Sequence, residues 1–290
     1  MIKIVNAKLA DGSMVDVEVQ NNLISKVSKS SGAKSGEVLD ATGKMLLPGL
    51  VDLHTHLREP GREDAETVLS GSTSAVAGGY TAISSMANTN PVADTAGVVE
   101  QIYRLGKEAG LCDVNPIGAV TKGIKGEQLA ELGAMADSIA AVRIFSDDGN
   151  CVADPLIMRR ALEYVKTYNG IIAQHAQDPR LTVNAQMNEG SVSARIGLPG
   201  WPAIAEEAII ARDILLAEHV QSRLHICHVT TAGGVELIRW AKKRGIQVTA
   251  EVTPHHLLLT DELVENYDPI YKVNPPLRTQ KDVMALREGL

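Results

Sequence analysis

The sequence is poor in cysteine and in aromatic residues. It has 3 cysteines in 290 residues, and aromatic residues make up 3% of the chain. An odd number of dispersed cysteines, with no Cys-x-x-Cys pair, argues against a disulfide framework and against a zinc site built from thiolates. We therefore expect a reduced, cytoplasmic environment for this chain.

Long hydrophobic runs and basic clusters are also missing. No stretch approaches the ~20 apolar residues that span a bilayer, and the N-terminal MIKIVNAKLADG predicts a strand and a turn rather than a signal peptide. The net charge is −7, with Lys and Arg dispersed along the chain. The sequence therefore argues against a membrane and against nucleic acid as partners.

Two different patterns divide the chain near residue 48. Residues 1–48 contain short β-like runs separated by Asp-Gly and Asn-Asn turns, which predict a small and partial β-domain. In residues 49–290, short apolar runs alternate with amphipathic helical stretches such as 94–110 and 203–219. Strands that alternate with helices predict a parallel sheet.

Seven apolar runs that end in polar residues are predicted to be strands. They are residues 49–56, 80–89, 113–120, 140–149, 170–177, 222–230 and 246–256. A closed (β/α)8 TIM barrel has eight strands, and 44% apolar residues in 290 suit a core of that size. We expect an α/β barrel that is incomplete at its C-terminus, with about seven of eight strands present. An open doubly wound sheet, which needs no eighth strand, is the alternative.

Two histidines lie at the end of the first predicted barrel strand. His54 and His56 are two residues apart in VDLHTHLREPG, so both side chains project from one face of the strand. Active sites of such barrels lie at the carboxyl ends of the strands. Two imidazoles about 6–7 Å apart along a strand can converge on one metal ion. For an isolated motif, a hydrogen-bonded histidine pair is the simpler alternative.

Other strand ends carry similar side chains. His175 ends the fifth run, His228 the sixth, and Asp147 and Asp148 the fourth. Because the carboxyl ends of barrel strands meet around the barrel axis, these histidines and a carboxylate predict a metal site there. Nitrogen and oxygen ligands suit Zn²⁺, with Mn²⁺, Co²⁺ or Fe²⁺ as alternatives. Five ligands exceed the usual tetrahedral set, which favours two metals bridged by one carboxylate.

Seven segments resemble the amidohydrolase superfamily, and within it dihydroorotases of the bacterial type that carry an aspartate in place of a carboxylated lysine. They are DLHTHLREPG, MANTNP, FSDDG, IGLPGWPAIAEEAIIARD, ICHVTT, EVTPHHLLLTDE and KVNPPLR. The resemblance implies reversible hydrolysis of the cyclic amide of L-dihydroorotate to N-carbamoyl-L-aspartate, a step of pyrimidine biosynthesis. We also expect two zinc ions per subunit, a homo-oligomer and an association with aspartate transcarbamoylase.

The resemblance also implies a role for each metal ligand. His54 and His56 would bind the first metal, His175 and His228 the second, and Asp148 would bridge both. The family's spacing selects Asp148 over its neighbour, and Asp147 would then support the site or cap a turn.

Four residues are implied to contact the substrate: His56, Arg58, Asn88 and Asn274. Arg58 lies two residues after His56, and a guanidinium binds a carboxylate through two parallel hydrogen bonds. Without the family match, both asparagines would be interpreted as turn residues. One residue of the pair His255 and His256 either lines the site or belongs to a helix entry, and we interpret His219 and His225 as peripheral.

One departure from the family bears directly on catalysis. The family's last barrel strand ends in the segment Asp-His-Ala-Pro-His, whose aspartate moves a proton in the reaction, and the sequence contains no such segment. We expect this catalytic aspartate to lie beyond residue 290. The alternatives to a dihydroorotase are an allantoinase- or hydantoinase-like cyclic amidohydrolase and a non-catalytic dihydroorotase-like subunit of aspartate transcarbamoylase. Arg58 favours a dihydroorotase over the allantoinases and hydantoinases, which carry another residue at this position.

Overall fold

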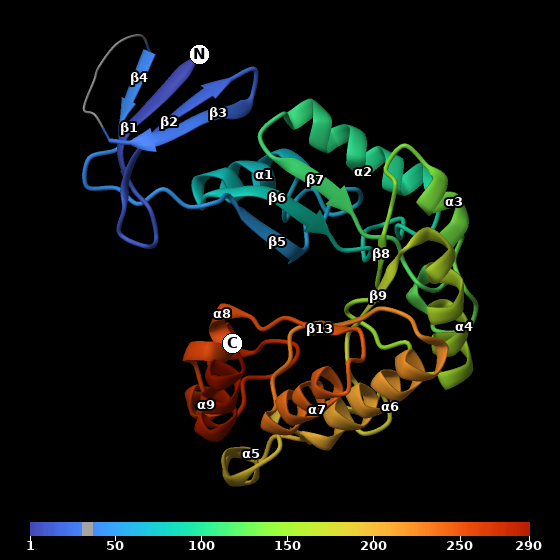
Figure 1. The fold of residues 1–290 in the computed structure, drawn as a ribbon. Helices are drawn as coiled ribbons and strands as arrows, with labels where there is room; N and C mark the ends of the chain where they lie inside the picture. Colours follow the sequence, from blue (N-terminus) through green and yellow to red (C-terminus); the bar gives the residue numbers. More distant parts are fainter. Residues whose placement is uncertain (31–36) are drawn as a thin grey trace. The chain divides into compact units, whose positions relative to one another are not determined.

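The structure, a computed structural model, describes residues 1–30 and 37–290. The chain divides into two compact units, Met1–Leu50 and Val51–Leu290. Each unit has its own sheet and its own hydrophobic core (Figure 1).

The first unit is a four-stranded sheet with the order β3-β2-β1-β4. Its strands are β1 (Ile2–Lys8), β2 (Met14–Gln20), β3 (Leu23–Lys29) and β4 (Glu37–Asp40). The neighbours β1, β2 and β3 are antiparallel, whereas β4 runs parallel to β1. Val15 and Val17 are two residues apart on β2 and therefore point to one face, where they pack with Ala7 and Ala41.

Seven strands form the sheet of the second unit, as far as the structure describes it. They are β5 (Leu50–Thr55), β6 (Tyr80–Ser85), β7 (Asp113–Pro116), β8 (Ile144–Phe145), β9 (Ile171–Gln174), β12 (Leu224–Ile226) and β13 (Val248–Ala250). β5-β6-β7 and β8-β9-β12-β13 are each hydrogen bonded in sequence order, and a parallel bridge between Gly118 and Phe145 joins the two sets. A doubly wound sheet would reverse its strand order, so the barrel prediction is confirmed. All seven predicted strands are present, and each is shorter than predicted.

Helices follow the strands and lie along their outer side, as Figure 1 shows for α2, α4, α6 and α7. The helices are α1 (Val68–Ala77), α2 (Ala96–Ala109), α3 (Leu132–Asp137), α4 (Pro155–Val165), α5 (Ser191–Ile196), α6 (Ile204–Val220), α7 (Ala232–Lys243), α8 (Pro254–Leu258) and α9 (Gln280–Gly289). Two short strands, β10 (Met187–Asn188) and β11 (Gly200–Trp201), pair with each other. The remaining helical turns are η1 (Lys122–Ile124), η2 (Lys166–Tyr168), η3 (Asp261–Asn266) and η4 (Pro269–Tyr271). The predicted helices at 94–110 and 203–219 are confirmed as α2 and α6.

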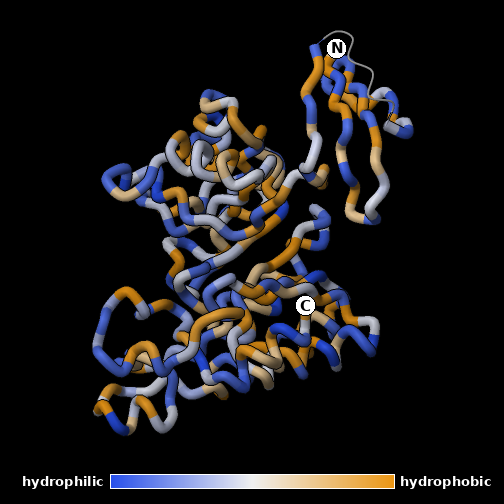
Figure 2. Tube along the Cα trace, turned by 90° about the vertical axis from the view of Figure 1, so that its left-hand side faces the viewer, coloured by the Kyte–Doolittle hydropathy of each residue, from blue (hydrophilic) through white to orange (hydrophobic). Residues whose placement is uncertain are grey.

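The core of the second unit lies between strands and helices. Ile83 of β6, Phe145 of β8 and Ile172 of β9 belong to one buried cluster with Leu162 of α4 and Ile214 of α6. The trace in Figure 2 changes between hydrophobic and hydrophilic residues along the helices, as expected for helices with one buried face. Within the described residues, no helix is long and apolar enough to cross a membrane.

Helix α2 lies unusually close to strand β7. Its buried residues Val99, Ile102 and Gly106 are spaced as one helical face requires. A Cβ on Gly106 would lie 2.5 Å from the Cβ of Val114 in β7. The helix can therefore approach the strand this closely only because residue 106 is glycine.

This close approach gives a stability prediction. We expect Gly106→Ala to lower the free energy of unfolding by about 1–3 kcal/mol, because the overlap with Val114 outweighs the better helix propensity of alanine. Gly97→Ala in the same helix is the matched control, since a Cβ there has no heavy atom within 4 Å. Urea unfolding measures both variants. Adding Val114→Ala should restore part of the loss, and equal stability of the two alanine variants would contradict the packing argument.

Candidate metal centre

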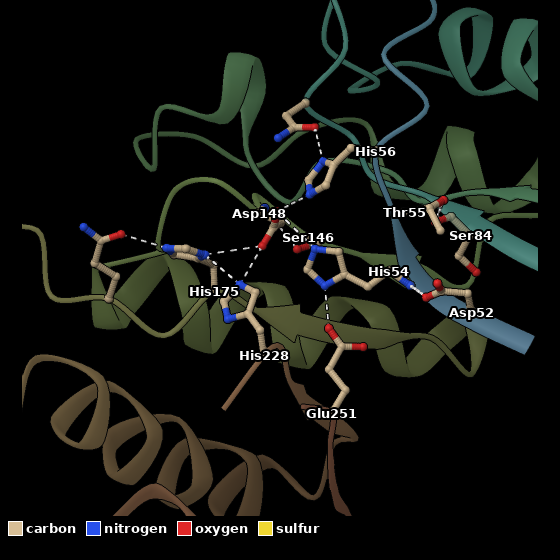
Figure 3. A network of polar contacts seen from close by, with 12 residues as sticks. Asp52, His54, Thr55, His56, Ser84, Ser146, Asp148, His175, His228 and Glu251 are labelled. Atoms are coloured by element: carbon tan, nitrogen blue, oxygen red, sulfur yellow. Dashed lines mark hydrogen bonds and ion pairs between the residues drawn. The ribbon is translucent and has the colours of Figure 1, made fainter. Parts of the chain in front are cut away.

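Asp148 lies at the centre of a group of four imidazoles (Figure 3). Its Oδ2 is 3.3 Å from Nε2 of His54 and 3.3 Å from Nε2 of His56. Its Oδ1 is 3.0 Å from Nε2 of His228 and 3.3 Å from Nδ1 of His175. The two oxygens of one carboxylate therefore face two separate pairs of histidines.

The positions of these side chains are set by the carboxyl ends of the strands. His54 is in β5 and His56 just after it, and the two-residue period leaves their ring centroids 5.2 Å apart. His175 comes directly after β9, while His228 and Asp148 follow shortly after β12 and β8. Because the strands are neighbours in one curved sheet, their carboxyl ends bring all five predicted ligands together.

The far ring nitrogens of two histidines also have partners. Nδ1 of His56 lies 3.0 Å from Oδ1 of Asn88, and Nε2 of His175 lies 2.7 Å from Oε1 of Gln177. An amide oxygen only accepts, so each of these ring nitrogens donates its proton. A neutral ring in this tautomer would offer its unprotonated nitrogen to a metal on the side of Asp148.

Burial and hydrogen bonding set the charges in this group. Burial lowers the pKa of His56 and of His228, so both rings are neutral at pH 7. Burial opposes the charge of Asp148, but hydrogen bonds from His175, His228 and His54 hold its pKa well below the usual range. The centre therefore combines two neutral imidazoles, those of His56 and His228, with an ionised carboxylate.

Glu251 contacts this group, and the sequence analysis missed it. It comes directly after β13, and its Oε1 contacts Nδ1 of His54 on the side of the ring opposite Asp148. Burial lowers the pKa of His54, but hydrogen bonds to Asp148, Cys227 and Glu251 outweigh it and raise the pKa to about 12. Glu251 fits the rule that selected the other candidates, a polar residue at the end of an apolar strand. Applying that rule to the seventh strand would have found it.

His225 was interpreted as peripheral, and this was wrong. Its side chain is buried, with Nδ1 2.8 Å from Oγ1 of Thr249 and Nε2 3.3 Å from Oε2 of Glu251. The register of β12 with β13 pairs His225 with Thr249. The ring therefore lies among the side chains of two neighbouring strands rather than at the surface.

Three groups of side chains in the described part of the chain have ligand atoms within 4.8 Å of one another. They are His54, His56 and Asp148; Asp148, His175 and His228; and His54, Cys227 and Glu251. The first two offer only imidazole nitrogen and carboxylate oxygen, a donor set that fits a borderline divalent ion such as Zn²⁺. They share Asp148, whose two oxygens face the two groups as a bridging carboxylate requires. These residues therefore could hold a metal.

A cavity of about 730 Å³ opens onto the centre, and Arg58, Asn88 and Asn274 line it. Arg58 has a φ of 61°, which is uncommon for a residue with a side chain and is frequent at functional sites. Asn274 lies in a segment anchored by the buried Arg278, whose guanidinium donates to Oγ1 of Thr230 at 3.0 Å. The residues predicted to bind substrate thus line the same cavity as the predicted ligands.

His255 and His256 belong to the short helix α8. His255 lines the cavity. His256 is buried with its Nε2 3.2 Å from the carbonyl oxygen of Pro275, and burial lowers its pKa to about 3. The structure therefore separates the pair into one residue beside the cavity and one that packs against the following segment.

Asp147 is turned toward the loop after β7. Its Oδ1 accepts hydrogen bonds from the backbone N–H groups of Val120 at 2.8 Å and Thr121 at 2.9 Å, and the Thr121 hydroxyl donates to its Oδ2. Burial raises the pKa of Asp147, while these hydrogen bonds act in the opposite direction. The side chain therefore fastens the loop after β7 to the end of β8.

Solved structures with the same fold are hydantoinases. The L-hydantoinase of Arthrobacter aurescens matches 98% of this chain and 65% of its own with a TM-score of 0.80 at 23% identity. The D-hydantoinase of Bacillus sp. AR9 matches 99% of this chain and 65% of its own, with a TM-score of 0.79 at 20% identity. At these identities the likeness shows the fold alone.

Sequence comparisons identify the family. The model described as "Dihydro-orotase-like" matches residues 43–233. The chain is 68% identical over 284 residues to the dihydroorotase of Streptomyces coelicolor. The aligned region covers 98% of this chain and 66% of that protein. It is 55% identical to the dihydroorotase of Mycobacterium tuberculosis, and the aligned region covers 97% of this chain and 65% of that protein. The chain belongs to the dihydro-orotase-like family, and it spans slightly less than two thirds of the length of these relatives.

The contacts of Asp147 generate a second prediction. We expect Asp147→Ala to lower the free energy of unfolding of the metal-free protein by about 2–5 kcal/mol, since two buried N–H groups lose their acceptor. Asp64→Ala, which removes an exposed carboxylate beside Arg62, should change it by less than about 0.5 kcal/mol. Urea unfolding followed by circular dichroism provides both values. Similar values for the two variants would show that the Asp147 contacts do not hold the loop.

Proposed function

We propose that this chain acts as a metal-dependent dihydroorotase, which reversibly hydrolyses the cyclic amide of L-dihydroorotate to N-carbamoyl-L-aspartate. The observation that carries the proposal is the pair of histidine groups around Asp148, in a chain 68% identical to a dihydroorotase. We include in the proposal the cytoplasmic location, the homo-oligomer and the association with aspartate transcarbamoylase that the resemblance implied.

The proposal assigns two Zn²⁺ ions to the centre. His54 and His56 would hold the first ion, His175 and His228 the second, and Asp148 would contact both. The distances of 3.0–3.3 Å between Asp148 and the four ring nitrogens support this division. When bound, such ions activate water and stabilise negative charge on a carbonyl oxygen.

The protein's own residues would bind and orient the substrate. Arg58 at the cavity wall would bind its carboxylate through two parallel hydrogen bonds. Asn88 and Asn274 would offer donors and acceptors to the ring amides. Asn88 also holds His56, which lines the same cavity and was predicted to contact substrate. These contacts would place the ring amide beside Asp148.

The metal assignment predicts a stoichiometry. Zinc-loaded protein should contain about two ions per chain by elemental analysis. Asp148→Ala should lose both ions, because both groups lose their shared carboxylate, whereas His228→Ala should lose one. His219→Ala changes an exposed histidine on α6 and should retain both. An Asp148→Ala protein with unchanged zinc content would refute the bridging role.

The substrate assignment predicts turnover that depends on Arg58. With Zn²⁺ supplied, dihydroorotate should lose its ultraviolet absorbance as the ring opens. Arg58→Ala should raise KM by about 10–100-fold through the loss of charge-assisted hydrogen bonds, and Arg58→Lys should recover only part of this. Arg62→Ala, at an exposed ion pair nearby, should leave KM unchanged.

Two outcomes would contradict the substrate assignment. A zinc-loaded chain that neither opens dihydroorotate nor binds carbamoyl aspartate in calorimetry would refute it. The second outcome concerns a neutral cyclic amide. If the unaltered protein and Arg58→Ala both turn it over at the same rate, and neither turns over dihydroorotate, a hydantoinase-like activity is favoured.

A further inference from the structure

His54 has a charged partner on each side of its ring (Figure 3). Its Nε2 lies 3.3 Å from Oδ2 of Asp148, and its Nδ1 contacts Oε1 of Glu251. His54 belongs to β5 and Glu251 follows β13, and these strands stand at opposite ends of the sheet order. The contact therefore links two strands that do not pair with each other in the part of the chain that the structure describes.

His225 lies beside the other oxygen of Glu251. This oxygen, Oε2, lies 3.3 Å from Nε2 of His225, whose Nδ1 lies 2.8 Å from Oγ1 of Thr249. Glu251 is thus a carboxylate with one oxygen on each of two imidazoles.

The partner of His54 differs in kind from the partners of two other candidate ligands. His56 and His175 contact the neutral amide oxygens of Asn88 and Gln177. Both kinds of partner orient a ring, but a carboxylate also makes the opposite nitrogen a stronger base. The charge of Glu251 therefore acts on one of the two histidine groups. In the part of the chain that the structure describes, the ion pairs of His175 and His228 are with Asp148.

We propose that Glu251 is a positioning residue for the metal position at His54 and His56. Its carboxylate accepts the Nδ1–H of His54 and so directs the Nε2 lone pair of that ring toward Asp148 and the ion. The ring of His225 lies 3.3 Å from the second oxygen of Glu251 and limits the room that this carboxylate has between the strands. This proposal rests on the proposed function, because it requires His54 to be a metal ligand.

The experiment measures metal affinity on the full chain rather than turnover. Zn²⁺ binding is titrated against a chelator of known affinity, and Co²⁺ absorption reports the coordination. Glu251→Gln keeps the shape of the side chain and removes its charge, so we expect one of the two ions to bind about 10–100-fold more weakly and the other to bind as before. Glu218→Gln is the matched control, because Glu218 is also partly buried and paired, with Arg244 at 2.6 Å.

A second variant tests whether His225 acts through Glu251. His225→Gln alone should weaken the same ion by a smaller factor. In the double variant the effect should equal that of Glu251→Gln alone, since residues that act through one contact are not additive. Fully additive effects, or weakening of both ions to the same extent, would overturn the positioning role.

Two further outcomes distinguish a failure of the proposed metal centre from a failure of this inference alone. If the unaltered chain binds neither Zn²⁺ nor Co²⁺, the proposed metal centre itself fails. If it binds two ions and Glu251→Gln binds them equally well, only this inference fails. Cys227→Ser should leave both affinities unchanged; a loss as large as that of Glu251→Gln would mean that His54, Cys227 and Glu251 hold an ion themselves.

A measurement on the unaltered protein keeps the proposal testable if Glu251→Gln does not fold. Nitrogen-15 NMR of the zinc-loaded protein distinguishes the two ring nitrogens of His54. The proposal expects a proton on Nδ1 and the metal on Nε2. A metal on Nδ1 would overturn it.

Discussion

The second unit is organised around a buried carboxylate that needs compensation. Asp148 is 4% exposed, and a charge at that depth is stable only with close polar partners. Its partners come from β5 and from the ends of β9 and β12. A slip of one residue in any of these strands would turn its histidine to the opposite face. The charge of one side chain therefore constrains the register of several strands.

Two consecutive aspartates have different tasks. Asp148 faces the histidines, while Asp147 accepts hydrogen bonds from Val120 and Thr121 in the loop after β7. Asp147 follows the end of β8 and Asp148 lies in the turn after it, so the two side chains leave the backbone in different directions. The second aspartate thus supplies the charge, and the first fixes the strand end on which that charge is carried.

The period of the sequence predicted which residues reach the site, because a strand's alternation is local. The shared face of His54 and His56 was found in this way, whereas His175 and His228 were found as polar residues at the ends of apolar runs. The distances of all four to Asp148 agree with these predictions. The choice between the two aspartates needed a family resemblance, since either could face the axis. The binding of metal ions by these residues and the roles of the substrate residues stay predictions.

The contacts between strands were not predictable from that local pattern. The pairing of His225 with Thr249 depends on how β12 and β13 align, and the contact of Glu251 with His54 depends on how the sheet curves. Strand lengths were overestimated for a similar reason: only Ile144 and Phe145 of the fourth run enter the ladder. The two aspartates lie just beyond the end of this strand.

The contact between His54 and Glu251 spans 197 residues of sequence, and that between Asp148 and His228 spans 80. Long-range contacts form late, because a large loop must close before they add any stability. Glu251 can reach His54 only after the intervening strands have assembled. The capacity to capture an ion would therefore report the completion of folding, and a nascent or partly folded chain would leave its histidines apart.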